Sequence, residues 1–203
     1  TPGRVQRNTP PAKTWFGVGS LDPRMDGRVA EIQAILNDAG NCSVTPNIRA
    51  AKWMKLVVNA MSLGPMAMLG LPVNAAAEIP GMRELVLQIG SEAMEAGQMI
   101  GHPVEPIFGL TQDDVRGANQ LHAKLLDKLT RDIGPRARDC VLQDHIKGRY
   151  SEVDLINGLV VEESAKRGKK APANAAVAEI TRRIQNGTLK PDVSNLELAR
   201  QLI

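Results

Sequence analysis

The sequence contains very few aromatic side chains. Phe, Trp and Tyr make up 2% of its 203 residues, so the core has to be built from aliphatic residues and eight methionines. A β-sandwich usually needs more aromatic and β-branched residues than this. The composition therefore favours a mainly α protein in which helices pack on one another. The length is enough for one sizeable core or two modest ones.

Cysteine is also scarce. Cys42 and Cys140 are the only two, and neither belongs to a CxxC or Cys/His pattern. His102, His122 and His145 have no partner at the spacing of a metal site. We therefore expect no metal site and no disulfide framework. Reduced thiols in a cytoplasmic protein are the simplest expectation.

The sequence has no large excess of charge and no uninterrupted apolar span. The net charge is +3, and the densest basic stretch, SAKRGKK at 164–170, has no interleaved aromatic residues to stack on bases. This predicts a solvated helix end rather than a nucleic-acid surface. The apolar segment 53–71 has the length of a membrane span, but Lys55, Asn59 and the Gly64-Pro65 pair lie within it. With no signal peptide recognisable, we expect neither a nucleic-acid nor a membrane partner.

Common catalytic and phosphate-binding motifs are missing as well. The sequence contains no Walker motif, no GxSxG and no HExxH. GVGS at 17–20 follows a predicted strand, but it lacks the third glycine and the long helix entry of a dinucleotide fingerprint. These motifs therefore supply no candidate site.

Strand signals are confined to the first 46 residues. Segments 13–19 and 41–46 predict short strands, and 22–40 predicts a helix with Val29, Ile32, Ile35 and Leu36 at helical spacing. Only helices are predicted afterwards, at about 47–69, 79–101, 111–134, from Cys140, 151–168, 172–187 and 195–203. A boundary near residue 46 would separate a small α/β piece, 1–46, from an all-helical domain, 47–203, of ordinary domain size.

Lys55 and Asn59 are the polar residues of an otherwise apolar helix. They are four residues apart and share one helix face, and Leu63 continues that line. A helix that is apolar nearly all round is buried, so the pair needs an explanation. Lys55 could extend to the surface beside a satisfied core amide. Alternatively, an amine and an amide face a ligand, and the spacing leaves both interpretations open.

Glu152 also has two interpretations. Ser151 is a predicted N-cap, and Asp154 stands where a capping box has its acid. Acids in a first turn interact favourably with the helix dipole, which would explain Glu152 without any function. The other interpretation is a carboxylate at a binding site.

Two segments carry a family resemblance. AKWMKLVVNA at 51–60 and LQDHIKGRYSEVDLINGLVVEESAKRGKKAPANAAV at 142–177 resemble the C-terminal helical domain of ketopantoate reductases (2-dehydropantoate 2-reductases). The second segment is the more specific. The resemblance covers essentially the whole chain. It implies a mainly α fold, the helical C-terminal domain of a 6-phosphogluconate-dehydrogenase-like reductase. Residues 13–46 resemble the last strand-helix-strand of that family's Rossmann domain, whose glycine-rich loop would precede residue 1.

The resemblance assigns roles residue by residue. It implies that Lys55 is the catalytic lysine, that Asn59 is a substrate-binding asparagine, and that Glu152 lines the cofactor-substrate cleft. Cys140 falls where family members commonly have a substrate-binding serine. Leu63 falls where they often have a second asparagine. Both departures leave the exact substrate open, because losing an amide hydrogen bond can change specificity.

The activity implied is the NADPH-dependent reduction of ketopantoate to pantoate in pantothenate and coenzyme A biosynthesis. The main phosphate site of NADPH would lie upstream of residue 1, so the 203-residue chain alone is expected to be inactive. One alternative is a related 2-hydroxy acid dehydrogenase with another small 2-keto acid substrate. Another is a non-catalytic helical dimerisation module, and a homodimer is compatible with either enzyme.

Overall fold

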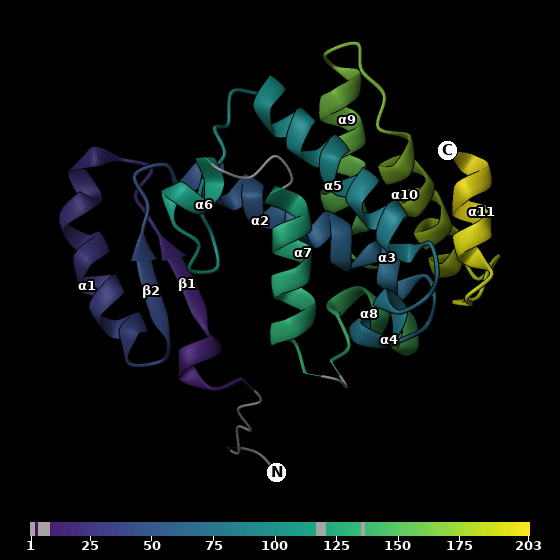
Figure 1. The fold of residues 1–203 in the computed structure, drawn as a ribbon, viewed down its shortest axis with the longest axis horizontal. Helices are drawn as coiled ribbons and strands as arrows, with labels where there is room; N and C mark the ends of the chain where they lie inside the picture. The colour runs from purple at the N-terminus through teal and green to yellow at the C-terminus, as the bar shows by residue number, and fades with distance from the viewer. Residues whose placement is uncertain (1–2, 4–8, 117–120, 135–136) are drawn as a thin grey trace. The chain divides into compact units, whose positions relative to one another are not determined.

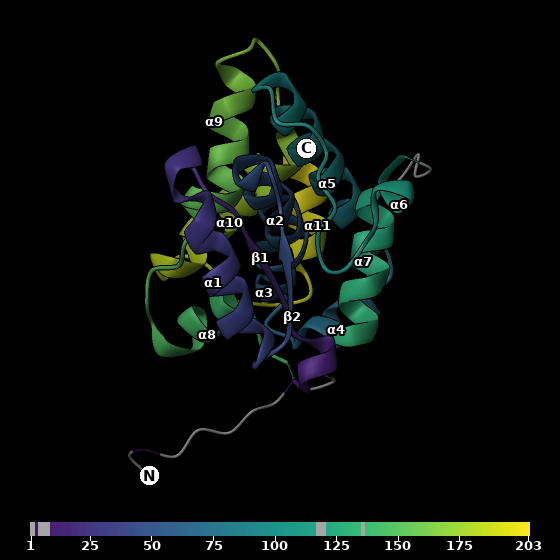
Figure 2. The ribbon, with the colours of Figure 1, turned by 90° about the vertical axis from the view of Figure 1, so that its left-hand side faces the viewer.

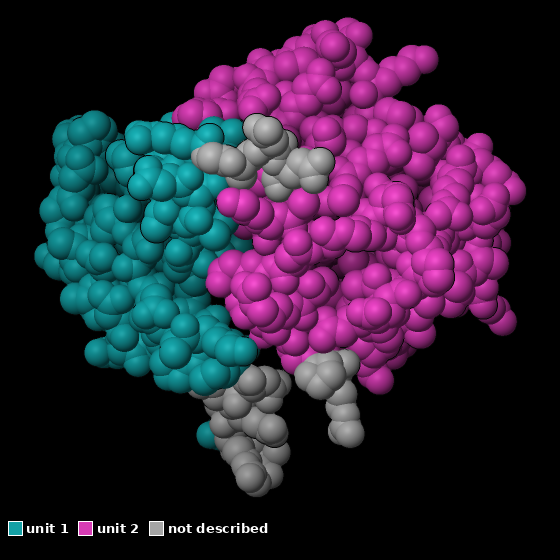
Figure 3. Space-filling view, viewed as in Figure 1, with its two compact units in different colours: residues 1–52, 104–118 teal, residues 53–103, 119–203 magenta. Residues whose placement is uncertain are grey.

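The chain is mainly helical, as the composition predicts (Figure 1). The computed structural model describes residue 3 and residues 9–116, 121–134 and 137–203. The chain divides into two compact units, coloured separately in Figure 3. Unit 1 comprises residues 1–52 and 104–118, and unit 2 comprises residues 53–103 and 119–203. The domain boundary near residue 46 stays a prediction.

Unit 1 is built on a strand-helix-strand segment, as predicted (Figure 2). Strands β1 (Trp15–Val18) and β2 (Asn41–Val44) pair in parallel, with Phe16 opposite Cys42. Parallel strands need a crossover, and α1 (Asp26–Asn37) supplies it after the short 3₁₀ turn η2 (Pro23–Met25). The unit also contains the 3₁₀ turn η1 (Pro11–Lys13) and helix α6 (Gln112–Arg116).

Helix α1 buries less of its apolar face than its spacing suggests. Val29 is buried, whereas Ile32 and Ile35 are 48% and 69% exposed. Leu36 is half-buried. Helical periodicity therefore identified the helix correctly but does not tell how much of its face is covered.

Unit 2 consists of helices. They are α2 (Ile48–Ser62, which starts in unit 1), α3 (Gly64–Ala67), α4 (Val73–Ala77), α5 (Met82–Met99), α7 (Leu121–Asp132), α8 (Cys140–Lys147), the π-helical turn η3 (Asp154–Gly158), α9 (Leu159–Ala165), α10 (Pro172–Gln185) and α11 (Asn195–Leu202). Helix α10 is central, because α3, α5, α9, α11 and η3 all pack against it. Its Val177 and Ile180 are completely buried.

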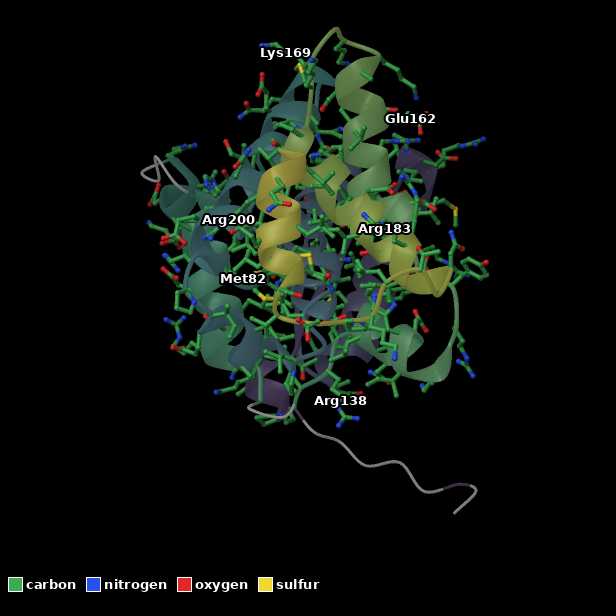
Figure 4. All side chains as sticks on the ribbon, turned by 90° about the vertical axis from the view of Figure 1, so that its right-hand side faces the viewer. Met82, Arg138, Glu162, Lys169, Arg183 and Arg200 are labelled. Carbon is green, nitrogen blue, oxygen red and sulfur yellow. The ribbon has the colours of Figure 1, made fainter. Side chains whose placement is uncertain are left out.

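Helix α11 closes one side of this bundle (Figure 4). It packs on α10 and brings the Arg200 guanidinium over Gly81, the residue before Met82 at the start of α5. Gly81 has φ 84°, a conformation that glycine adopts at little cost. The guanidinium thus occupies the space that a side chain at position 81 would need.

The apolar helix predicted over 47–69 is in fact two helices. The break falls at Leu63 and Gly64, and Pro65 has no N–H to continue the helical pattern. A Cβ added to Gly64 would lie 2.8 Å from Val177 Cγ1 and 3.1 Å from Asn157 Oδ1. Glycine is therefore required here for close packing of α3 against α10 and η3.

Two other expectations concern helices. The segment predicted as one helix over 111–134 contains α6 and α7, and residues 117–120 of that prediction lie outside the described residues.

In the parts of the chain that are described, every helix is too short or too polar to cross a membrane.

Substituting Gly64 tests the close packing at the break. We expect Gly64→Ala to lower the free energy of unfolding by about 1–3 kcal/mol, the usual cost of overpacking a tight core. Gly158→Ala is the matched control, because its added Cβ meets nothing closer than 3.5 Å. Urea unfolding followed by circular dichroism measures both. Equal stability of the two variants would contradict the packing role of Gly64.

Candidate functional site

Lys55 and Asn59 form a direct pair on α2. Lys55 Nζ donates a hydrogen bond to Asn59 Oδ1 at 2.6 Å. The Lys55 side chain is exposed and Asn59 is half-buried, whereas Val57 and Val58 on the other faces are 0% and 1% exposed. The pair is thus the polar edge of a helix that is otherwise buried in unit 2.

The surroundings of Lys55 weaken its hold on the proton. Loss of hydration lowers the pKa of its ammonium, and the charge of a Cys140 thiolate would act in the opposite direction. Solvent reaches the side chain, but the protein around it replaces part of its water. An amine with a lowered pKa gives up its proton more readily, which suits a general acid.

Cys140 is the first residue of α8 and lies close enough to Lys55 for their charges to interact. Its side chain is exposed and forms no disulfide. Partial loss of hydration raises the pKa of the thiol, and the negative charges of Asp139 and Glu152 raise it further. The thiol therefore stays protonated near neutral pH, where it is a weak hydrogen-bond donor and a poor nucleophile.

Glu152 precedes η3 and is exposed. Its charge acts on the Cys140 thiol, which in turn interacts with Lys55. The fold thus brings Lys55, Asn59, Cys140 and Glu152 into one region of unit 2, although α2 and α8 are far apart in the sequence. Their roles toward a ligand stay predictions.

The capping box predicted at Ser151 is not formed. Ser151 Oγ accepts a hydrogen bond from Val153 N at 3.4 Å, as a cap would. The Asp154 carboxylate does not complete the box. It pairs instead with Arg182 of α10, with Nη2 at 2.7 Å and Nε at 2.8 Å. A tertiary ion pair has replaced the local contact that the spacing suggested.

The sequence analysis missed the role of Asn157. This residue of η3 is completely buried, and its Nδ2 donates to the Ala60 carbonyl at 3.1 Å and to Asn174 Oδ1 at 3.0 Å. Ala60 follows Asn59, so the bond fixes the backbone beside the candidate site. An asparagine among the apolar positions Val153, Ile156 and Val160 was the available signal.

Buried Asn174 and half-buried Glu92 extend this contact into a network. The Glu92 carboxylate accepts from the backbone N–H groups of Ala173 and Asn174, each at 3.0 Å, at the start of α10. Asn174 Nδ2 donates to Glu92 Oε2 at 2.8 Å and to the Ile89 carbonyl at 3.1 Å. A carboxylate on free N–H groups at a helix N-terminus is electrostatically favourable. The network connects α2, η3, α5 and α10.

Asp139 supports the start of α8 beside Cys140. Its Oδ1 accepts from Leu142 N at 2.8 Å, the geometry of an N-cap. Only 8% of the residue is exposed, and Oδ2 has no hydrogen-bond partner among the described residues. Burial raises the pKa of this carboxyl to about 6. Its charged form is therefore held at a cost near neutral pH.

Residues 47–185 match the protein family described as "Ketopantoate reductase PanE/ApbA C terminal". This match covers more than half of the chain, so the chain belongs to the ketopantoate reductase family through its C-terminal domain. The resemblance noted in the sequence is thereby confirmed.

Two curated relatives are each named 2-dehydropantoate 2-reductase. The protein from Archaeoglobus fulgidus is 23% identical over 171 residues, which cover 84% of this chain and 52% of the relative. The protein from Pyrobaculum aerophilum is 26% identical over 164 residues, which cover 79% of this chain and 52% of the relative. The chain therefore spans about half the length of the curated relatives it matches.

Solved structures support the fold. A PanE/ApbA family ketopantoate reductase from Ralstonia eutropha has a TM-score of 0.68 at 20% identity, covering 87% of this chain and 53% of that one. D-mandelate dehydrogenase with NADH and anilino(oxo)acetate has a TM-score of 0.71 at 18% identity, covering 85% and 53%. A dimeric ketopantoate reductase from Staphylococcus aureus has a TM-score of 0.61 at 16% identity, covering 85% and 55%.

The two glycines of the GVGS segment are closely packed within the chain. Gly17 and Gly19 follow the pattern of a short glycine motif, but both are explained by packing within the chain. A Cβ on Gly17 would meet the Trp15 ring at 2.6 Å, and one on Gly19 would meet the Thr45 carbonyl oxygen at 2.6 Å. Within 9–116, 121–134 and 137–203, no three His, Cys, Asp or Glu side chains gather as a metal site.

Titration of Asp139 should be visible in the stability of the protein. Its pKa is raised from 3.8 to about 6 on folding, so the folded state holds the proton longer than the unfolded state. The contribution of Asp139 to the free energy of unfolding is therefore greatest below pH 4, and it is lost as the pH rises through about 6. A shift of this size corresponds to about 3 kcal/mol.

This decrease in stability with rising pH should be absent from Asp139→Asn, because asparagine keeps an oxygen that accepts from Leu142 N and carries no charge. This variant should be more stable than the wild type at pH 7. Denaturant unfolding from pH 3.5 to 7.5 measures the difference between the two proteins. Asp144→Asn on the same helix should retain the fall. A parallel pH dependence of wild type and Asp139→Asn would show that Asp139 does not titrate in this range.

Proposed function

We propose that the protein containing this chain reduces a small 2-keto acid to the 2-hydroxy acid with NADPH, and that ketopantoate is the first candidate substrate. It would then act as a cytoplasmic 2-dehydropantoate 2-reductase in pantothenate and coenzyme A biosynthesis. The observation that carries the proposal is the pair of Lys55 Nζ and Asn59 Oδ1, 2.6 Å apart, within the segment that matches the ketopantoate reductase family.

Lys55 would act on the oxygen of the keto group. A nicotinamide cofactor, when bound, supplies the hydride to the keto carbon, and negative charge then develops on the carbonyl oxygen. An ammonium at that oxygen stabilises the charge and donates the proton that completes the hydroxyl. The lowered pKa of Lys55 favours this transfer, and solvent access allows reprotonation.

Asn59 would orient both the lysine and the substrate. Its Oδ1 accepts from Lys55, which fixes the direction of the ammonium. The two hydrogens on Nδ2 can then donate to a substrate oxygen. Holding the amine and the substrate in one geometry is a large part of what an enzyme contributes to a bimolecular reaction.

Glu152, just before η3, and Cys140, at the start of α8, would complete the site opposite the residues of α2. Glu152 is an exposed acceptor that can hold a hydroxyl of the substrate or of the nicotinamide ribose. Cys140, with its raised pKa, would contact the substrate as a neutral thiol. The phosphates of the cofactor would bind outside the described residues, because Gly17 and Gly19 are taken up by internal packing.

A second candidate is a 2-hydroxy acid dehydrogenase with a different 2-keto acid. The similarity to D-mandelate dehydrogenase favours it, as do Leu63 and Cys140 at positions where the resemblance implies an asparagine and a serine. Assaying the full-length protein with a panel of 2-keto acids and both nicotinamide cofactors separates the two. The dimeric relative from Staphylococcus aureus also makes a homodimer a reasonable proposal, which sedimentation can test.

Lys55→Met tests the role of the amine. It keeps the length of the stem and removes the charge, so we expect kcat of the full-length enzyme to fall by roughly 10²-fold or more. The melting temperature should be retained, because methionine occupies the space of the lysine stem and carries no charge that would lose its hydration on folding. Lys52→Met is the control, an exposed lysine one turn earlier on the same helix, and should keep normal turnover.

Two results would argue against this role. Near-normal turnover of Lys55→Met would make Lys55 a surface lysine. A collapsed melting curve would make it a residue of structural importance. Failure of the wild-type enzyme to reduce any 2-keto acid would instead favour a non-catalytic helical module.

A further inference from the structure

The line formed by Lys55 and Asn59 ends at Leu63, and this end of the candidate site is apolar. Leu63 is half-buried and packs against a cluster of Ala67, Val141 and Leu142. Because Val141 and Leu142 follow Cys140 directly, Leu63 lies beside the start of α8. One helical turn, about 5.4 Å, separates Leu63 from Asn59, which is within reach of a small ligand held by Asn59.

The backbone at Leu63 adds no polar group to this end. Leu63 N donates to the Asn59 carbonyl at 2.9 Å, and the Leu63 carbonyl accepts from Ala67 N at 3.0 Å. The next residue, Gly64, has its carbonyl occupied by Met68 N at 3.0 Å. A ligand hydroxyl placed here would find the N–H and the carbonyl of Leu63 already bonded within the chain.

Cys140 directly precedes Val141, one of the residues packed around Leu63. Its thiol stays protonated because loss of hydration and neighbouring negative charges disfavour the thiolate. A neutral thiol is a weak donor and acceptor and behaves more like a small apolar group. Both side chains at this end, Leu63 and Cys140, therefore suit a hydrocarbon substituent better than a hydroxyl.

We propose that Leu63 and Cys140 are specificity-determining residues that select a 2-keto acid with an apolar side chain over one with a hydroxylated side chain. This inference rests on the proposed reductase function. Lys55 and Asn59 would bind the keto group of every such acid. The residues at the Leu63 turn would then determine which substrate side chain is accepted. Of the two proposed candidates, the inference therefore favours the second, a 2-keto acid without the hydroxyl, over ketopantoate.

Two probe substrates isolate the effect of one hydroxyl. Trimethylpyruvate has the carbon skeleton of ketopantoate without the terminal hydroxyl. With the full-length protein we expect kcat/KM for trimethylpyruvate to exceed that for ketopantoate by roughly tenfold to a hundredfold, because the side chains of Leu63 and Cys140 offer the hydroxyl no strong hydrogen-bond partner. A tenfold preference for ketopantoate by the wild type would overturn the inference and leave the proposed function standing.

Variants then locate the selectivity. Leu63→Asn should shift the ratio of the two kcat/KM values toward ketopantoate by roughly tenfold or more, since the new amide can bond the hydroxyl. Cys140→Ser should shift it in the same direction, and Leu63→Met should leave it as it is. Leu129→Asn places the same change at a half-buried leucine of α7 and should also leave the ratio unchanged.

The outcomes separate the two proposals. An unchanged ratio in both Leu63→Asn and Cys140→Ser would overturn the assignment of these residues. If Leu63→Asn does not fold, the wild-type ratio and Cys140→Ser still decide the question. Absence of turnover with both probes and with phenylglyoxylate, under NADPH and NADH alike, would refute the reductase function itself and the inference with it.

Discussion

The buried amide of Asn157 is the contact on which the arrangement of unit 2 depends. It joins the end of α2 to α10 through two hydrogen bonds, and Asn174 and Glu92 carry the connection to α5. A buried amide without partners would cost about 1–3 kcal/mol, so these side chains stabilise the fold only in one arrangement. Asn157 Oδ1 has no hydrogen-bond partner among the described residues, which makes the two bonds of its Nδ2 the more important. Such a network specifies a unique packing of helices more strongly than aliphatic contacts do.

This network and the break at Gly64 together explain how distant residues come to share one region. Asn157 fixes the carbonyl of Ala60, directly after Asn59, while the break turns the chain into α3. Helix α8 packs on α3. Its first residue, Cys140, is thereby brought to the polar edge of α2. The candidate site therefore depends on the packing of α3, α8 and η3 around the end of α2, and not on a contiguous sequence motif.

Much of the fold could be predicted from the sequence, because strand and helix signals are local. Segments 13–46 and most later helices were found where periodicity, Gly and Pro indicated them. The division of 47–69 into α2 and α3 was missed because the apolar run continues through Gly64 and Pro65. The ion pair of Asp154 with Arg182 and the role of Asn157 were missed because both depend on α10, which no local pattern positions. The contact of Lys55 with Asn59 follows from their spacing, whereas the approach of Cys140 and Glu152 depends on tertiary packing.

The π-helical turn η3 acts as a register device in the chain. A π turn holds one residue more than an α turn, so the chain before it is rotated by about 100° relative to a continuous α-helix. Glu152 and Val153 precede η3 in the chain, and α9 with its buried face follows it. Deleting one residue between Asp154 and Gly158 would allow a regular helix and still leave α9 packed on α10. The same deletion would turn Glu152 away from Cys140, so the length of this segment is constrained as well as the identity of Asn157 within it.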